Sequence, residues 1–151
     1  MASINNKLSS AVKKGDADKV KTLMLETKCD ARFKDKYGWT ALMWAAAYGQ
    51  APCVSLLLPV SDLLAKDHRG FTALMYAAIY GQTSCVSLLL PVSDVLAKDR
   101  SGRSASELAV KKSHYALARL IDAFTLAQSE RLALNSWVPA VTAPKKTSRR
   151  V

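Results

Sequence analysis

Two consecutive segments of the chain are nearly identical, and this internal repetition limits the possible folds more than any other feature. One reads GWTALMWAAAYGQAPCVSLLLPVSDLLAKDHR from Gly38, and the next reads GFTALMYAAIYGQTSCVSLLLPVSDVLAKDRS from Gly70. Glycine returns at Gly102, so the period is 32 residues. A period of this size is typical of a solenoid, in which each unit buries its apolar face by stacking on its neighbours. The sequence therefore predicts a stack of small repeated units.

The composition suits a single soluble domain. The chain has 151 residues, of which 50% are hydrophobic, and this is enough to build a core. Its first residues turn polar at once, unlike a signal peptide, and its apolar runs are too short to span a bilayer. Three cysteines without a secretion signal favour reduced thiols. We therefore expect an intracellular protein of the cytoplasm.

The chain is strongly basic, with a net charge of +10 from 22 lysine and arginine residues against 12 aspartate and glutamate residues. Four of the positive charges lie close to the end of the sequence, at Lys145, Lys146, Arg149 and Arg150. The others are more frequent at the two ends of the body than in its middle. A basic balance favours acidic proteins, nucleic acid or anionic membranes as partners, without choosing among them.

Each repeat carries the local signals of a turn followed by two helices. The step Asp35–Gly38 is typical of a tight turn, and the hydroxyl of Thr40 suits the N-cap of a helix over 41–48. Gly49 then ends this first helix, and Pro59 ends the second. The later repeats have the same signals at Asp67–Gly70, Thr72, 73–80, Gly81 and Pro91, and then at Asp99–Gly102 and Ser104.

Weaker copies flank the two central repeats, and we expect them to cap the stack. The upstream copy keeps small and apolar residues in register but places lysines where the central repeats are more apolar. The downstream copy has a second helix that is expected to continue through 125–137. Its possible packing points are Phe124, Ala127, Leu132 and Leu134.

The sequence therefore predicts an all-α solenoid of stacked helix–turn–helix units. One domain is expected at 1–136 and a flexible basic tail at 137–151. The four repeats are expected at 1–34, 35–66, 67–98 and 99–136.

The buried positions of the two central repeats are predicted by their equivalence. Cys53 and Cys85 occupy the same place in adjacent repeats, where stacked helices lie ~8–10 Å apart. Because a disulfide needs Cα atoms within roughly 7 Å, we expect the two thiols to pack between repeats without a bridge. Trp44 and Tyr76 lie inside the helix pattern and are also expected in the core.

These residues resemble the ankyrin repeat, whose pattern is D-x-x-G-x-T-P-L-H-x-A-A-x-x-G followed by V-x-x-L-L. The resemblance covers residues ~4–122. Met43 and Met75 stand where the family has a histidine, and methionine cannot form the hydrogen bonds of that residue. The Ala-Leu-Met wording is similar to that of short ankyrin-only proteins of flagellated protists. The matching residues of the second repeat are Asp35, Gly38, Thr40, Leu42, Ala45, Ala46, Gly49, Val54, Leu57, Leu58 and Asp62.

The resemblance implies a site for a protein partner. In the family, partners usually touch the two residues after the turn aspartate, the residue after the turn glycine and the two residues before the helix-ending glycine. On this chain these positions form an aromatic centre with positive ends, which suits a protein segment with apolar anchors and acidic flanks. The predicted partner-binding residues are Tyr37, Trp39, Tyr48, His68, Arg69, Phe71, Ile79, Tyr80, Arg100, Arg103, Lys111 and Lys112.

A purely structural role for the aromatic residues remains open from the sequence. Trp39 and Phe71 could lie on the next turn, and Tyr48 and Tyr80 could stack on each other.

The leading interpretation of function is an adaptor or scaffold that binds a protein, and the alternative is an electrostatic binder of nucleic acid or anionic membrane. The alternative would use Lys13, Lys14, Arg103, Lys111, Lys112 and the tail. Phosphate-led binding collapses steeply with salt, so salt dependence separates the two. The sequence has no catalytic, metal-binding or phosphate-loop motif, so we expect no enzyme activity, no cofactor, no metal and no small-molecule substrate.

Overall fold

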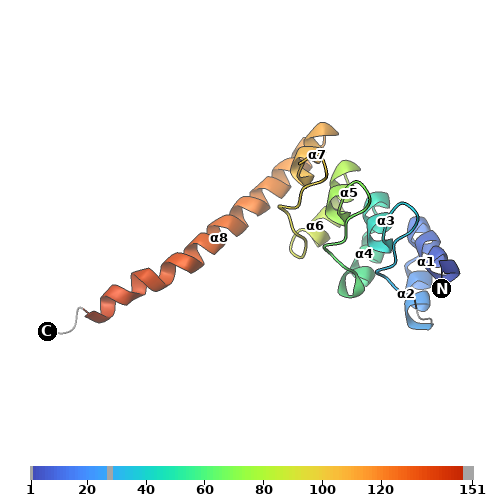
Figure 1. The fold of residues 1–151 in the computed structure, drawn as a ribbon, viewed down its shortest axis with the longest axis horizontal. Helices are drawn as coiled ribbons and strands as arrows, with labels where there is room; N and C mark the ends of the chain where they lie inside the picture. Colours follow the sequence, from blue (N-terminus) through green and yellow to red (C-terminus); the bar gives the residue numbers. More distant parts are fainter. Residues whose placement is uncertain (1, 27–28, 148–151) are drawn as a thin grey trace.

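The computed structural model describes residues 2–26 and 29–147, with side chains for residues 4–25 and 29–134. Within these residues the regular structure consists of α-helices and one 3-10 turn. The predicted all-α solenoid is therefore confirmed, and Figure 1 shows its units stacked side by side. The elements are α1 (Ala2–Lys14), α2 (Ala17–Glu26), α3 (Ala41–Tyr48), α4 (Ala51–Leu57), η1 (Leu58–Val60), α5 (Ala73–Ile79), α6 (Thr83–Leu89), α7 (Ala105–Lys111) and α8 (Tyr115–Thr147).

The helices form two rows. The first helices of the repeats, α1, α3, α5 and α7, contact one another in chain order. The second helices α2, α4 and α6 make the other row, and α8 packs against α7. Figure 1 shows α8 leaving the stack and projecting well beyond it.

Small side chains let the first helices approach closely. Ala45 on α3 and Ala77 on α5 are fully buried at equivalent places. Leu57 and Leu89, which end α4 and α6, are also completely buried. The two central repeats thus contribute the same small and branched side chains to one core, whose close packing leaves little room for substitution.

The first helices begin at the caps that the sequence predicts. The Thr40 hydroxyl accepts a hydrogen bond from the Met43 N–H at 3.3 Å, and Thr72 is bonded in the same way one repeat later. Ser104 and Glu107 form a reciprocal capping box at the start of α7.

A row of side chains fixes the end of each first helix to the next repeat. Gln82 lies over Gly49 and donates a hydrogen bond to the Ala47 carbonyl at 3.2 Å. A Cβ on Gly49 would lie 2.3 Å from the Gln82 amide oxygen, so a larger residue here would displace the Gln82 side chain from this contact. The Gly49 φ of 72° also favours glycine.

The same contact recurs one repeat before and one repeat after. Gln50 donates to the Lys13 carbonyl at 3.3 Å, and His114 Nε2 lies 3.1 Å from the Ile79 carbonyl oxygen. In the fourth repeat, His114 therefore makes the contact that glutamine makes in the second and third repeats.

A second row ties the loops together. The Lys34 ammonium donates to the Lys66 carbonyl at 2.8 Å, and Lys66 donates to the Lys98 carbonyl at 3.1 Å. Both bonds join residues 32 positions apart, so the repeat period brings equivalent backbone groups into register.

The N-terminal copy and the cysteines occupy their predicted places in the core. Leu8 and Val20 are buried, and Gly15 ends α1 with a φ of 74°. Cys53 and Cys85 are completely buried, and the Cys85 thiol donates to a carbonyl of α3 at 3.9 Å.

Helix α8 is longer than the expected helix, which ends at residue 137. It continues to Thr147, so no break in the helix marks the expected boundary between a domain at 1–136 and a flexible tail at 137–151. The side chains of Lys145 and Lys146 and the whole of residues 148–151 lie outside the described residues. Of the expected packing points, Phe124 is half-buried against the core, whereas Ala127, Leu132 and Leu134 are exposed.

Candidate functional site

The turns that precede the first helices share one hydrogen-bond pattern. One carboxylate oxygen of Asp67, Oδ1, accepts from the backbone N–H groups of Arg69 (2.9 Å) and Phe71 (2.8 Å). Asp35 and Asp99 accept from the equivalent N–H groups at 2.8–3.0 Å. Aspartate suits this position because its short side chain reaches backbone groups of its own turn. The turns therefore project their side chains in register along one edge of the stack.

The second carboxylate oxygen, Oδ2, has a different partner in each repeat. Asp35 accepts from the indole Nε1 of Trp44 at 3.0 Å, and Asp67 accepts a short hydrogen bond from the Tyr76 hydroxyl. Trp44 and Tyr76 are equivalent residues on α3 and α5. The equivalent residue on α7 is Leu108, which has no polar group.

Arg103 replaces this missing donor in the fourth repeat. Its Nε donates to Asp99 Oδ2 at 3.0 Å, and its Nη2 lies 2.8 Å from the same oxygen. Burial alone would raise the pKa of Asp99, but the Arg103 and Ser101 N–H groups and the Arg103 guanidinium outweigh burial and lower the pKa. Asp99 therefore stays ionised, and it offsets the charge of Arg103.

Aromatic rings pack between the second and third repeats. The Trp39 ring lies between Trp44 and Tyr76, with centroid separations of 4.3 Å and 4.0 Å. Tyr48 meets Trp44 edge to face at 5.9 Å, and the Lys13 ammonium lies 3.6 Å from the Trp44 ring centroid. The cluster fixes the orientation of Trp39 before any ligand binds.

Three hollows lie along the turns and first helices. The N-terminal hollow, about 590 Å³, has walls that include Ser9, Lys13, Phe33, Lys36, Tyr37 and Trp44. The central hollow, about 400 Å³, is lined by Tyr37, Trp39, Trp44, Asp67, His68 and Arg69. The C-terminal hollow, about 270 Å³, has walls that include Arg69, Phe71, Tyr80, Arg103, Lys111 and Lys112.

The hollows share walls and so form one groove across the repeats. Tyr37 and Trp44 line both the N-terminal and the central hollow. Arg69 lines both the central and the C-terminal hollow. The three hollows therefore adjoin one another in order from the first repeat to the fourth.

The groove brings together ten of the twelve predicted partner-binding residues. Tyr48 and Arg100 do not line the three hollows, although both are exposed beside them. Tyr37 and Tyr80, each 54% exposed, are the most open aromatic side chains in the groove. Among the described side chains, Tyr80 makes no ring contact with Tyr48, so these two do not stack.

Two aromatic positions are less open than the sequence suggests. Phe71 is only 8% exposed, because the Tyr76 ring covers one side and the Arg69 guanidinium lies 5.0 Å from its centroid. Trp39 is half-buried, since it packs on Tyr76 of the next repeat. Trp39 thus bridges two repeats, whereas Phe71 packs within its own repeat, and both rings also line the groove.

Sequence reasoning also missed part of the groove. Trp44 is expected in the core but is half-buried and forms a groove wall, whereas Tyr76 is buried as predicted. Lys13, which the sequence already indicates as a binding residue of the electrostatic alternative, enters the N-terminal hollow because α1 lies directly beside α3. The sequence does carry one signal for this difference. Trp44 and Tyr76 are equivalent residues of the repeat, and the larger tryptophan ring is harder to bury completely at the same position.

The polar groups of the groove serve binding better than acid–base chemistry. The carboxylates of Asp35, Asp67 and Asp99 already accept hydrogen bonds at both oxygens. His68 is exposed at a turn tip, against Gly38 of the preceding turn. Within the described residues, no three histidine, cysteine or acidic side chains gather in a way that could hold a metal ion.

Comparisons with known proteins agree with this architecture. A family model described as ankyrin repeats, in three copies, matches residues 8–99 and 60–125. No curated protein matches the chain. Among the described residues, no helix is long and apolar enough to cross a membrane.

Proposed function

The chain belongs to the ankyrin-repeat family, and from this premise we propose that it is an adaptor that holds a segment of a partner protein in its groove. Ankyrin repeats are generally protein–protein interaction modules. The fold is a rigid stack, so recognition depends on the side chains that the stack presents.

The arrangement of the three adjoining hollows is the observation that most supports this function. The three hollows lie in a row and share Tyr37, Trp44 and Arg69 as walls. A peptide segment is long and narrow, whereas a small ligand would need one enclosed pocket. We therefore infer that the ligand is a polypeptide that touches several repeats.

The central hollow is the expected anchor point of that segment. Trp39 and Trp44 are fixed in the aromatic cluster, so binding costs little side-chain entropy at these rings. Tyr37 stands at the edge and is exposed, with the Lys36 ammonium 4.9 Å from its ring centroid. Such rigid aromatic surfaces are typical of binding hot spots, and an apolar side chain of the partner would fill the hollow.

The electrostatic alternative has less structural support. Arg103 is paired with Asp99, and Lys13 is held over the Trp44 ring. These two cations are thus partly engaged within the protein itself. A nucleic acid or membrane surface would need many free charges on one face.

A comparison of two matched bait proteins tests the function. The groove variant carries Tyr37→Ala and Tyr80→Ala, and the control carries Leu64→Ala and Leu96→Ala. The control residues are also exposed, at 69% and 66%, but lie in the loops away from the groove. The two double variants therefore remove similar exposed apolar surface at different sites.

Each bait is used at equal concentration to capture proteins from the source cells, and captured proteins are compared quantitatively by mass spectrometry. We expect a partner that wild-type and control retain and that the groove variant loses. A partner recovered equally by both variants would contradict binding in the groove. Binding of that partner is then measured with purified proteins.

A further inference from the structure

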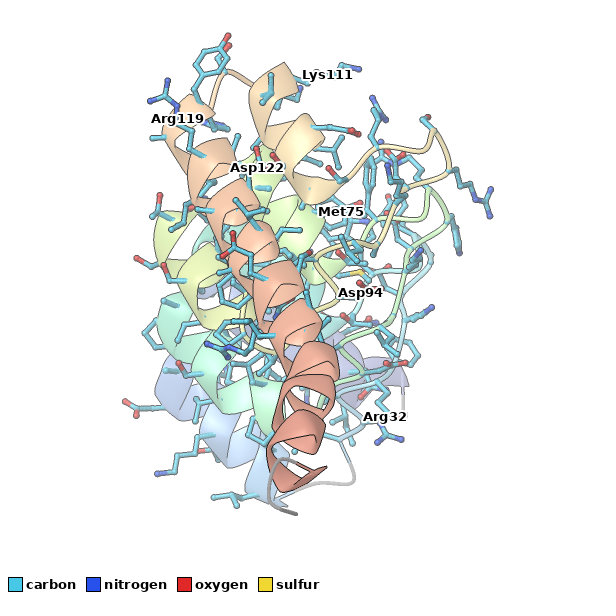
Figure 2. All side chains as sticks on the ribbon, turned by 90° about the vertical axis from the view of Figure 1, so that its left-hand side faces the viewer. Arg32, Met75, Asp94, Lys111, Arg119 and Asp122 are labelled. Carbon is cyan, nitrogen blue, oxygen red and sulfur yellow. The ribbon has the colours of Figure 1, made fainter. Side chains whose placement is uncertain are left out.

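The C-terminal hollow differs in charge from the other two. Four basic side chains, Arg69, Arg103, Lys111 and Lys112, form its walls together with aromatic and aliphatic groups. No acidic side chain lines it among the described residues. Figure 2 shows Lys111 at the upper edge of the stack, at the end of α7. Four of the 22 lysine and arginine residues thus gather in one concave surface.

Three of the four cations form no ion pair among the described residues. Among the residues that the structure describes, the one ion pair is between Arg103 and Asp99. Glu107 lies one helical turn before Lys111, but its carboxylate is engaged by the Ser104 N–H at 2.9 Å. Lys111 and Lys112 therefore meet no carboxylate within ion-pair distance, and their charges are available to a ligand. Arg69 forms no ion pair either, although its hydrogen bond to Tyr76 and, to a smaller extent, the nearby Asp67 carboxylate raise the pKa of its guanidinium.

Arg69 is held in place at the boundary of the hollow. Its Nη2 donates to the Tyr76 hydroxyl at 3.4 Å, and its guanidinium lies over Phe71. Burial, followed by the hydrogen bond to Asp67, raises the pKa of Tyr76, so this hydroxyl stays protonated. A guanidinium has five N–H donors, so most donors of Arg69 remain free.

Helix geometry alone does not account for the two lysines. A cation at the C-terminal end of a helix offsets the helix dipole, and Lys111 lies in the last turn of α7. However, α3 and α5 end at equivalent places with no basic residue in the last turn. The two central repeats therefore form such helices without lysine, and a basic pair stands at the end of the first helix only in the two outer repeats, at Lys13 and Lys14 on α1 and at Lys111 and Lys112 on and after α7.

We propose that the C-terminal hollow is a binding site for a multiply charged oxyanion carried by the partner segment, either a phosphoryl group or adjacent carboxylates. The proposal rests on the function proposed above. A phosphoryl group carries about −1.5 to −2 charges at pH 7 and three acceptor oxygens. Arginine and lysine bind such groups through charge-assisted hydrogen bonds, which are stronger than neutral ones.

The position of this site also sets the spacing of the recognised motif. The central and C-terminal hollows are one repeat apart and meet at Arg69. Neighbouring helices in a packed stack are about 8–10 Å apart, and an extended chain covers about 3.3 Å per residue. The apolar anchor and the anion should therefore be about three residues apart in the partner sequence.

Inorganic phosphate tests the hollow without any knowledge of the partner. The full-length protein, labelled with nitrogen-15, is titrated and followed by amide chemical shifts. One variant carries Lys111→Gln and Lys112→Gln. The control carries Lys19→Gln and Lys21→Gln, two exposed residues on α2, so both variants lose the same net charge.

We expect phosphate to shift the amides of Arg69, Lys111 and Lys112 most, in wild type and control. The shifts should vanish in the Lys111 and Lys112 variant. Two results would overturn the proposal. One is that the amide shifts at Arg69, Lys111 and Lys112 in the wild-type protein are no larger than those around Lys19 and Lys21. The other is that the shifts persist in the variant with Lys111→Gln and Lys112→Gln.

Synthetic peptides then distinguish the sources of the anion. Each peptide carries a leucine anchor and, three residues away from it, a phosphoserine, a pair of aspartates or an unmodified serine. Each of these is placed before the leucine in one peptide and after it in another. A further phosphoserine peptide doubles the spacing. Binding is measured by fluorescence anisotropy against the full-length protein.

We expect an anionic peptide of short spacing to bind about tenfold more tightly than the serine peptide, because several exposed ion pairs contribute a little each. The advantage should be lost in the Lys111 and Lys112 variant. A tighter phosphoserine peptide assigns the site to phosphoryl groups, and equal affinity of the aspartate peptide assigns it to carboxylates. Less than about a twofold advantage for every anionic peptide would overturn the proposal.

The captured partner separates failure of this site from failure of the groove. A partner lost from the Tyr37 and Tyr80 variant but unaffected by the Lys111 and Lys112 substitutions, and by phosphatase treatment, would retain the groove and overturn the anion site. A partner indifferent to both double variants would overturn the proposed function itself.

Discussion

The indole of Trp44 donates a hydrogen bond to the carboxylate of Asp35 across 3.0 Å, and this bond joins a turn to the helix that follows it. The next repeat keeps the bond with a tyrosine hydroxyl in place of the indole, at Tyr76 and Asp67. The fourth repeat uses Arg103 on Asp99 instead. The second oxygen of each turn aspartate thus has a donor, but the donor is an indole, a phenol or a guanidinium in successive repeats. Because these donors also line the groove, its hollows differ in aromatic character and charge.

Removing the buried hydroxyl of Tyr76 tests the importance of this donor. Tyr76→Phe leaves the buried Asp67 oxygen without its donor, and we expect a loss of about 1–3 kcal/mol in the free energy of unfolding. Urea denaturation followed by circular dichroism measures the loss. Tyr48→Phe is the matched control, because the Tyr48 side chain is exposed, and it should change stability very little. Equal losses in the two variants would contradict the assigned role.

The core leucines should be far more important for stability than the end of the chain. Leu57→Ala or Leu89→Ala removes a completely buried side chain and should cost about 2–5 kcal/mol. Deletion of residues 140–151 should cost almost nothing. Melting temperatures of the three variants, measured by differential scanning calorimetry, check this difference. An equally large fall on deletion would mean that the end of α8 is docked to the stack.

The contact between His114 and Gly81 predicts an unequal effect of alanine at two glycines. Gly81 and Gly102 both have positive φ, so Gly→Ala strains the backbone at either place. A Cβ at Gly81 would lie 2.7 Å from the His114 ring, whereas nothing lies near a Cβ at Gly102. Gly81→Ala should therefore destabilise the protein more in urea unfolding.

The double variant Gly81→Ala with His114→Ala checks the cause. It should be more stable than the sum of the two single changes predicts, because the clash is removed. Strict additivity would show that the ring is not responsible.

The buried thiols predict a pH dependence of stability. Burial is the main cause that raises the pKa of Cys85, to about 11, and the Cys53 thiol has a raised pKa for the same reason. When the pKa of a thiol is higher in the folded than in the unfolded state, the thiol contributes to the free energy of unfolding, and this contribution is fully present below the unfolded-state pKa. That contribution is lost as pH rises through the folded pKa, so stability should fall between about pH 9 and pH 11.

The variant Cys85→Ala isolates this contribution from other groups that titrate at high pH. It should be less stable at neutral pH because of lost packing, but its stability should fall less steeply above pH 9. Parallel pH profiles of wild type and variant, measured by urea unfolding, would show that the Cys85 thiol does not contribute.

Local patterns account for the parts of the fold that the sequence predicts well. Thr40 and Asp35 act on backbone groups a few residues away, so their roles follow from spacing alone. The repeat period then places equivalent residues of neighbouring units together, which explains the burial of Cys53 and Cys85. These inferences need no knowledge of side-chain orientation.

Contacts between repeats determine the features of the structure that the sequence does not predict. The burial of Trp39 depends on the ring of Tyr76, which is 37 positions away in the sequence. The free charge of Lys111 depends on where Glu107 finds its partner, which the spacing of the two residues does not reveal. Gln50, Gln82 and His114 show an available signal, since they recur every 32 residues. Their roles emerge only when each is seen over the glycine of the preceding repeat.

The affinity of the captured partner for the two matched double variants tests the central claim most directly. Isothermal titration calorimetry at two salt concentrations compares wild type with the Tyr37→Ala, Tyr80→Ala protein and with the Leu64→Ala, Leu96→Ala protein. We predict that the groove variant loses more than about 2 kcal/mol of binding free energy at both salt concentrations, with the control unchanged and both variants folded. Unchanged affinity in the groove variant, together with binding that collapses with salt, would contradict the account and favour a purely electrostatic binder.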